Sequence, residues 1–273
     1  MLVLFLLVGA ASLLAAASAY IIVHRIPVVL MFHAIVEQPR GLDVSPQRLK
    51  TFLDSARVSD RALVFTTDSS DRSIYDEFAP RVREHGFSVI LFLMPSGIGR
   101  NGMLTWDQVR VLDRAGVVVA SHTLTHPWLA DLSDEELWCE QCASKQMIEA
   151  EIGYAVMAMA YPYDAFDERV KRMARQCGYT AAYSTAPGRR VADDDPLAIK
   201  RVTIADTTVA NPLLRWLVLS GFWVTAREVL LAFVPIEVPR KPQDWSYVQW
   251  RKTVKTGDDY RAFCSVSPSA GAH

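Results

Sequence analysis

The 273-residue chain lacks an excess of charge of either sign, because 29 Lys and Arg residues are balanced by 30 Asp and Glu residues and the formal net charge is −1. It also lacks a dense run of basic residues. Proteins that bind nucleic acids usually carry a basic patch that attracts the phosphate backbone. We therefore set this class of partner aside and expect no nucleic acid.

Cysteine is scarce, with four residues at Cys139, Cys142, Cys177 and Cys264. Only Cys139 and Cys142 form a CxxC pair, and a zinc ribbon needs two such pairs. These two cysteines fall in a stretch with helical periodicity, where a bond between their sulfurs would strain the helix. We expect core or surface thiols, with an oxidised Cys139–Cys142 pair as the alternative in an exported domain.

Charge is absent altogether between Met1 and Val23, where Leu, Val, Ala and Ile dominate. This stretch is long enough to cross the core of a bilayer as a helix. Because apolar character continues to Val23, we expect an uncleaved membrane anchor. A signal peptide cut after Ala17-Ser18-Ala19 is the alternative, since these residues follow the small-x-small rule. Both interpretations predict a domain outside the cytoplasm, at the cell surface, in the periplasm or secreted.

Short apolar runs alternate with longer amphipathic segments through the middle of the chain. The predicted strands are Pro27–Phe32, Ala62–Thr66, Ser88–Leu93, Val117–Ser121, Met157–Tyr161 and Thr180–Ser184. The predicted helices are Pro46–Ala56, Ile74–His85, Thr105–Ala115, Asp134–Ile152 and Asp167–Cys177. This alternation predicts an α/β domain with a parallel sheet, open or closed into a barrel. We expect the domain to span residues 24–205, after the segment 1–23.

A C-terminal helical extension and tail are predicted for residues 206–273. Asn211–Val234 is apolar and rich in Trp, but Arg215, Arg227 and Glu228 interrupt it. This composition indicates an amphipathic helix or helix pair and not a second membrane span. We expect it to cap the barrel, with a position on a membrane surface as the alternative.

Polar motifs follow three of the predicted strands at their carboxyl ends: Thr66-Thr67-Asp68, Ser121-His122 and Tyr161-Pro162-Tyr163. In parallel α/β sheets, ligand sites lie at this edge. His126 follows His122 by four residues, so the two imidazoles can converge on one metal ion if the chain turns helically after the strand. A carboxylate from elsewhere would complete a face of two histidines and one carboxylate, with positions open for water and substrate.

Taken in order, these motifs resemble those of the polysaccharide deacetylases of carbohydrate esterase family 4, from about Pro27 to about Val202. His122-Thr123-Leu124-Thr125-His126-Pro127 is identical to that family's HTxxHP motif. Thr66-Thr67-Asp68-Ser69-Ser70 lies where the family has Thr-Phe-Asp-Asp-Gly, and Tyr161-Pro162-Tyr163-Asp164 is similar to its Tyr-Pro-Tyr-Gly motif. The resemblance implies a distorted (β/α) barrel of about seven parallel strands that removes acetyl groups from N-acetylated sugars.

The resemblance also implies roles for individual residues. His122 and His126 would bind a divalent metal, zinc or else cobalt or nickel. Asp68 would be the general base that takes a proton from water. The backbone N–H of Tyr163 would stabilise the oxyanion.

One aspartate of the family's first motif is missing from this chain. An ungapped match through the following helix aligns Asp68 with the general base and Ser69 with the metal-binding aspartate. The alternative register aligns Asp68 with the metal ligand and Thr67 with the base, but it breaks the match in the helix. Asp164 and Asp71 are candidates for the missing ligand.

The family's late Leu-x-His motif, whose His acts as the general acid in many members, is not visible after Val202. His33 is the imidazole available for that role, with a strand-end histidine bonded to backbone as the alternative. Trp106, Trp128 and Pro162 are candidates for substrate binding, and ordinary half-buried packing is the alternative for each Trp.

The sequence thus predicts a metal-dependent hydrolase that removes N-acetyl groups from an envelope or extracellular polysaccharide. Its expected partners are an N-acetylated glycan substrate and, through residues 1–23, the membrane. The alternative is a deacetylase-like protein that binds glycan without turnover, because one aspartate of the first motif is missing.

Overall fold

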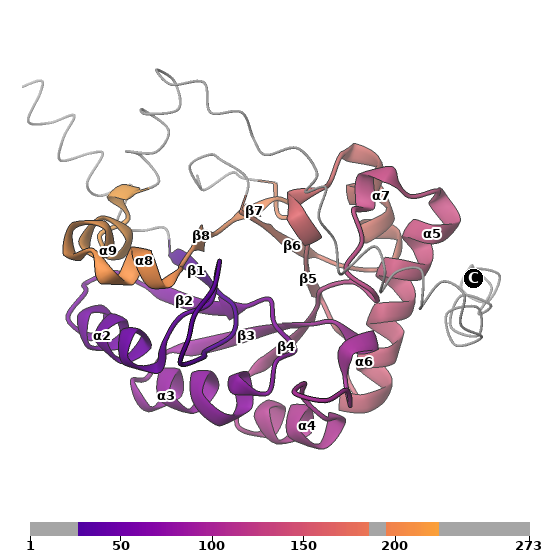
Figure 1. The fold of residues 1–273 in the computed structure, drawn as a ribbon. Coiled ribbons are helices and arrows are strands. Elements are labelled where there is room, and N and C mark those ends of the chain that lie inside the picture. The colour runs from indigo at the N-terminus through magenta and orange to yellow at the C-terminus, as the bar shows by residue number, and fades with distance from the viewer. Residues whose placement is uncertain (1–26, 186–194, 224–273) are drawn as a thin grey trace, which may run out of the picture.

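A strongly curved parallel sheet forms the centre of the molecule in the computed structural model, which describes residues 27–185 and 195–223 (Figure 1). Within these residues eight strands follow the order β7-β6-β5-β4-β3-β2-β1-β8. They are β1 Val28–Phe32, β2 Leu63–Thr67, β3 Ser88–Leu93, β4 Val118–Ser121, β5 Ala158–Ala160, β6 Ala181–Ser184, β7 Ile199–Lys200 and β8 Val202–Thr203. The sheet curls into a nearly closed barrel, so the predicted α/β barrel is confirmed, with one strand more than the seven expected.

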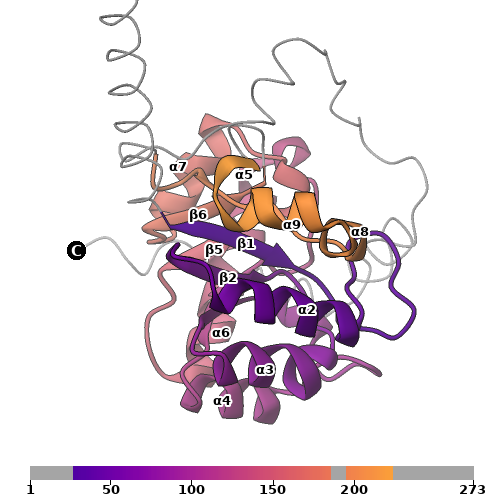
Figure 2. The ribbon, with the colours of Figure 1, turned by 90° about the vertical axis from the view of Figure 1, so that its left-hand side faces the viewer.

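Helices follow the strands and cover the outside of the sheet (Figures 1 and 2). They are α2 Pro46–Arg57, α3 Ala79–Glu84, α4 Trp106–Arg114, α5 Asp134–Trp138, α6 Ser144–Ile152, α7 Glu168–Gln176, α8 Asp206–Ala210 and α9 Pro212–Leu219. Wider π-type turns, Ile74–Phe78 and Cys139–Ala143, lead into α3 and join α5 to α6. The predicted helices Ile74–His85 and Asp134–Ile152 are therefore present as composite segments.

Apolar side chains on both faces of the strands explain why the sheet is buried on both sides. All five residues of β1 are buried, and the largest core cluster fills the layer between the sheet and the helices. Inside the barrel, Phe92, Ala120 and Ala160 pack together with Tyr183. Such strands offer polar groups to solvent or ligand only where they end, which confines the site to the ends of the strands.

The seam of the barrel lies between β7 and β8, which are the two edge strands of the sheet. Only Arg201 separates them in sequence. The backbone N–H of Arg201 donates to the carbonyl oxygen of Ser184 on β6 at 2.8 Å, and that of Ile204 donates to Met31 on β1 at 2.8 Å. The sequence analysis missed both edge strands, because two residues are too few to show a period.

The helices α8 and α9 pack beside α2 and cover the sheet near β1 (Figure 2). Val209, Val218 and Leu219 are buried in this contact, as expected for a cap. Residues 1–26, with the predicted anchor or signal peptide, and residues 224–273 lie outside the described part of the chain. Within the described part, no helix has the length and apolar character needed to span a bilayer.

A disulfide joins Cys142, in the turn between α5 and α6, to Cys177 at the end of α7, with 5.0 Å between their Cα atoms. The predicted free thiol is therefore wrong for both residues, and so is the alternative Cys139–Cys142 pair. The predicted thiol is also wrong for Cys139, which is disulfide-bonded as well. Tertiary packing of two helices decides the Cys142–Cys177 pairing, since the two residues are 35 positions apart.

The Cys142→Ser/Cys177→Ser variant is expected to lose about 2–4 kcal/mol of its free energy of unfolding, because the crosslink limits the conformations of the unfolded chain. Urea unfolding under non-reducing conditions measures the loss. Mass spectrometry of non-reduced peptides identifies the linked pair, and equal unfolding midpoints for variant and wild type would contradict the bond.

Candidate active site

Three of the predicted site residues lie together at the carboxyl edge of the sheet. His33 follows β1, Asp68 follows β2 and His122 follows β4. Nε2 of His122 lies 3.9 Å from Oδ2 of Asp68, and His33 is close enough for the charge of Asp68 to act on its pKa. The parallel register of the strands brings these residues to one edge, as the sequence predicted.

The loop after β4 returns His126 to His122, and it does so without the helical turn that the sequence analysis gave as the condition for this convergence. Thr123 and His126 instead adopt the left-handed region, with φ values of 66° and 58°. The N–H of Thr123 donates to Oγ of Ser121 at 3.2 Å, and that of His126 donates to Oγ1 of Thr123 at 3.0 Å. The two imidazole centroids lie 4.6 Å apart. Residues other than Gly seldom adopt this conformation, and they do so mainly at functional sites.

Glu140 holds the middle of this loop from the turn between α5 and α6. Its side chain is buried, and its carboxylate accepts hydrogen bonds from the backbone N–H of Thr125 at 2.8 Å and from the Thr125 hydroxyl. Its backbone carbonyl accepts from the N–H of Leu124 at 3.0 Å. The sequence analysis missed Glu140, although a carboxylate at a buried position of a predicted helix needs such partners.

Both loop imidazoles are in the neutral form that binds metals. Burial lowers the pKa of His122, and burial followed by the neighbouring His122 lowers the pKa of His126 well below its usual value. Nδ1 of His122 lies 3.0 Å from the carbonyl oxygen of Ala160. Since a carbonyl only accepts, Nδ1 carries the proton and Nε2 offers its lone pair on the side of Asp68.

Arg201 holds Asp68 from the seam of the barrel. Nη1 donates to Oδ1 of Asp68 at 2.5 Å and Nη2 donates to Oδ2 at 2.6 Å. The two side chains are 1% and 5% exposed, and the guanidinium carbon lies 5.1 Å from the ring centroid of Phe92. Burial alone would raise the pKa of Asp68. The charge of Arg201, the neighbouring His122 and the hydrogen bonds from Arg201 outweigh burial and lower this pKa to about 2, so Asp68 is a carboxylate at neutral pH.

Arg201 is the main site residue that the sequence analysis did not find. It lies beside Lys200 in the segment Leu197–Ile204, which is apolar apart from these two residues and Thr203. The sequence shows this charged residue in a mostly apolar segment, but only the closure of the barrel brings it to Asp68, 133 positions earlier.

The candidates for the missing metal ligand all have other partners. Oγ of Ser69 accepts from the N–H of Asp71 at 3.1 Å, and Oδ1 of Asp71 accepts from the N–H of Ser73 at 2.8 Å. Oδ1 of Asp164 accepts from the N–H of Thr185 at 2.6 Å, and its Oδ2 accepts from the Thr185 hydroxyl. Asp164 would therefore have to lose its hydrogen bonds to Thr185, at the end of β6, in order to bind a metal.

The two loop histidines are suitable ligands for a divalent ion, but the described residues around them do not supply a third ligand. Within residues 27–185 and 195–223, no group of three His, Cys, Asp or Glu side chains is arranged to hold a metal ion. His122 and His126 offer two neutral imidazoles, and the nearest carboxylate, Asp68, is bound to Arg201. The described residues thus fit an ion held by two histidines, with water or substrate as its other ligands, and do not fit an ion held by three side chains.

Aromatic rings form one wall beside the histidines. Tyr163, with a φ of 57°, lies edge-on to His126 with 4.5 Å between ring centroids and stacks on Trp128 at 5.6 Å. Tyr163 is partly exposed, whereas Pro162 is buried. Trp106 begins α4 and packs against the main core. Tyr163 and Trp128 are therefore better placed than Pro162 or Trp106 to touch a sugar.

His33 shows the clearest sign of an unused polar group. Its Nδ1 atom is buried and has no hydrogen-bond partner within the described chain. The alternative of a histidine bonded to backbone thus finds no support at Nδ1. Burial, the largest influence, lowers the pKa of His33.

Comparison with known proteins identifies related sequences and folds. Residues 55–182 match the family model for polysaccharide deacetylases. The Bacillus subtilis (strain 168) protein YxkH, whose name assigns it to the polysaccharide deacetylases, is 24% identical over 147 residues. That match covers 54% of this chain and 53% of YxkH, so the chain corresponds to about half the length of this relative.

Solved structures share the fold. The Streptococcus pyogenes deacetylase PplD in complex with acetate has a TM-score of 0.60 and 22% identity, covering 68% of this chain and 96% of that one. IcaB from Ammonifex degensii has a TM-score of 0.58 and 18% identity, with 70% and 96% covered. A polysaccharide deacetylase from Bacillus cereus has a TM-score of 0.59 and 24% identity, with 67% and 66% covered.

Proposed function

Because residues 55–182 make this chain a member of the polysaccharide deacetylase family, we propose that it is a hydrolase that removes N-acetyl groups from an envelope or extracellular polysaccharide. The observation that carries the proposal is the pairing of an ionised base with neutral imidazoles. Asp68 is held as a carboxylate by Arg201, and Nε2 of His122 lies 3.9 Å away.

Each part of amide hydrolysis has a candidate residue at this edge of the barrel. Asp68 accepts the proton of the attacking water. The backbone N–H of Tyr163 donates to the oxyanion. His33, with its unbonded Nδ1, delivers a proton to the departing amine when it is protonated, and returns to the neutral imidazole. A divalent ion, zinc or else cobalt or nickel, held by His122 and His126 would supply Lewis-acid polarisation of the acetyl carbonyl.

Glycan binding without turnover is the second candidate function. It is favoured because Ser69 and Asp164 already accept hydrogen bonds from backbone N–H groups. Within the described residues, this leaves the two imidazoles as the only side chains in place to bind a metal. Trp128 and Tyr163 would serve such a binding protein as a sugar platform.

The proposal includes a position outside the cytoplasm, with residues 1–23 as the attachment to the membrane. The Cys142–Cys177 disulfide supports it, since disulfides persist mainly in oxidising compartments. The 23-residue uncharged stretch at the N-terminus supports the membrane partner.

Metal content and acetate release together test the proposed function. The wild-type chain is expected to hold about one divalent ion and to release acetate from an N-acetylglucosamine oligomer. His122→Ala/His126→Ala is expected to lose both, with an unchanged circular dichroism spectrum. Equal metal content in the two proteins would contradict a metal site at these two histidines. Bound metal without acetate from any N-acetylated glycan would favour the binding function.

Ser69→Asp is expected to raise the affinity for zinc at least tenfold, or about 1.4 kcal/mol, because it adds an anionic oxygen beside two neutral imidazoles. Competition with a chromogenic chelator measures the affinity. The matched control is Ser69→Asn, which has the same shape without the charge and should gain little.

If Ser69→Asp leaves the affinity unchanged, the loss of zinc from Asp164→Ala or Asp71→Ala would identify the ligand that already fills the position. No change in any of these variants would show that the first motif is not part of the site.

A further inference from the structure

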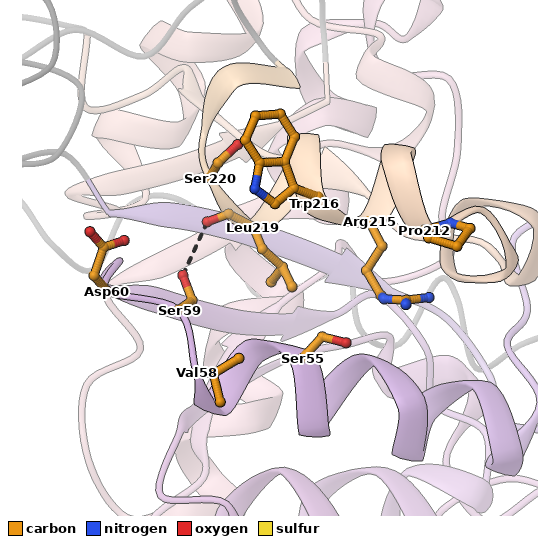
Figure 3. Close-up of a pocket in the computed structure, with 9 residues that line it drawn as sticks. All are labelled: Ser55, Val58, Ser59, Asp60, Pro212, Arg215, Trp216, Leu219 and Ser220. Atoms are coloured by element: carbon orange, nitrogen blue, oxygen red, sulfur yellow. Dashed lines mark hydrogen bonds between the residues drawn. The ribbon is translucent and has the colours of Figure 1, made fainter.

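A pocket lies on the outside of the barrel, between α2 and α9 (Figure 3). Its volume is about 380 Å³, and its lining includes none of the site residues described above. Small-molecule sites usually measure roughly 300–1,000 Å³. The pocket is therefore large enough for a ligand of its own.

Trp216 of α9 is one of the residues that line this pocket (Figure 3). The side chain is 57% exposed, although Trp is usually mostly buried. Its ring stacks at 22° to that of Phe222, with 6.1 Å between centroids. An open aromatic surface of this kind suits a flat ligand with C–H groups, such as the face of a pyranose ring, which packs against it by dispersion.

Hydroxyl groups and one guanidinium surround this surface. Oγ of Ser59 donates to the carbonyl oxygen of Leu219 at 3.2 Å, and Oγ of Ser55 donates to that of Thr51 at 2.8 Å. Each hydroxyl has used its proton and keeps an acceptor lone pair. Arg215 uses Nη1 to donate to the carbonyl oxygen of Val209 at 2.6 Å, and a guanidinium has five N–H donors in all. Donors and acceptors thus alternate around an aromatic platform.

The charge of the lining narrows the class of ligand. Among the described residues that line it, only Arg215 and Asp60 are charged, and they have opposite signs. A phosphate ligand would favour an excess of positive charge. A lipid surface would favour a continuous apolar face with a basic rim, but exposed Leu213 on the same helix is not part of the lining. An uncharged ligand rich in hydroxyl groups fits best.

We propose that the α2–α9 pocket is a second carbohydrate site, which binds one or two sugar units of the polysaccharide on which the histidine site acts. The identity of that glycan rests on the proposed function. Trp216 is the platform, and Ser55, Ser59 and Arg215 bond to sugar hydroxyls. A polymer held here has a higher effective concentration at the ends of the strands.

Fluorine NMR of the full chain labelled with 5-fluorotryptophan tests the second site. The Asp68→Asn background prevents turnover, and Trp216→Phe assigns the Trp216 signal. Titration with N-acetylglucosamine hexasaccharide is expected to shift this signal to saturation. The double variant Ser55→Ala/Ser59→Ala should raise the sugar concentration at half-saturation at least threefold. Leu213→Ala removes an exposed apolar side chain outside the pocket and should leave this concentration unchanged.

Retention on insoluble chitin gives a second measurement. Trp216→Ala should lower retention at least tenfold and Leu213→Ala should not. An unshifted Trp216 signal, equal losses in the two variants, or a shift with phosphatidylglycerol vesicles but not with sugar would overturn the second site. None of these readouts needs acetate release, so a failure of the proposed activity alone would leave the shift and the retention intact.

Discussion

Asp68→Asn is expected to lower acetate release from an N-acetylglucosamine oligomer by about 10²–10⁴-fold while the metal content stays the same. The reason is that Asn keeps the size of the side chain and cannot accept the proton of the attacking water. Arg201 now binds both oxygens of Asp68, so the carboxylate is not a ligand in the arrangement described. Acetate assay and metal analysis of the same preparation measure the two effects.

Asp71→Asn is the matched control, because Asp71 lies three residues away and its Oδ1 only accepts from the N–H of Ser73, which an amide oxygen also does. It should keep most of the activity. Loss of metal together with activity in Asp68→Asn would instead support the alternative register, in which Asp68 is the metal ligand and Thr67 aligns with the base. Full activity of Asp68→Asn would remove Asp68 from the chemistry.

Arg201→Met is expected to lower the free energy of unfolding by about 3–5 kcal/mol, because it leaves a buried carboxylate without its charged partner. Asp68→Asn should also destabilise the fold, since it leaves the guanidinium of Arg201 buried and unpaired. The double variant should lose less than the sum of the two single losses. Urea unfolding of the four proteins measures this coupling, and additive losses would contradict a direct pair.

Arg201→Met is also expected to change how activity and stability depend on pH. In the wild type, the pKa of Asp68 is lowered from 3.8 to about 2, so the stabilisation is fully present above about pH 4 and is lost as the pH falls through 2. Without Arg201, burial dominates and the pKa of Asp68 rises. The acid limb of acetate release should therefore move to higher pH in Arg201→Met. The destabilisation of this variant should be largest at neutral pH, where Asp68 is ionised without its partner, and should diminish as the pH falls and the carboxyl is protonated. Identical acid limbs would show that Arg201 does not control the ionisation of Asp68.

Local patterns predicted most elements of the fold. Continuous apolar runs identified β1 to β6 within one or two residues, and helices such as α4 and α7 matched their amphipathic segments closely. A capping box of Ser133 and Glu136 begins α5, and this local pattern can be read from the sequence. The composite helices were harder to foresee, because a π-type turn changes the hydrogen bonding of a helix without interrupting its amphipathic pattern.

The sequence by itself determined which polar residues end the strands. Strand period, motif spacing and parallel order are enough to bring His33, Asp68 and His122 to one edge. Contacts between distant segments were decided by the tertiary structure alone. They include the disulfide between Cys142, in the turn before α6, and Cys177 at the end of α7, the use of Asp164 to hold the end of β6, and above all the pair of Asp68 with Arg201. Arg201 reaches Asp68 only because two edge strands of two residues each close the barrel, and this long-range pairing leaves no periodic trace in the chain.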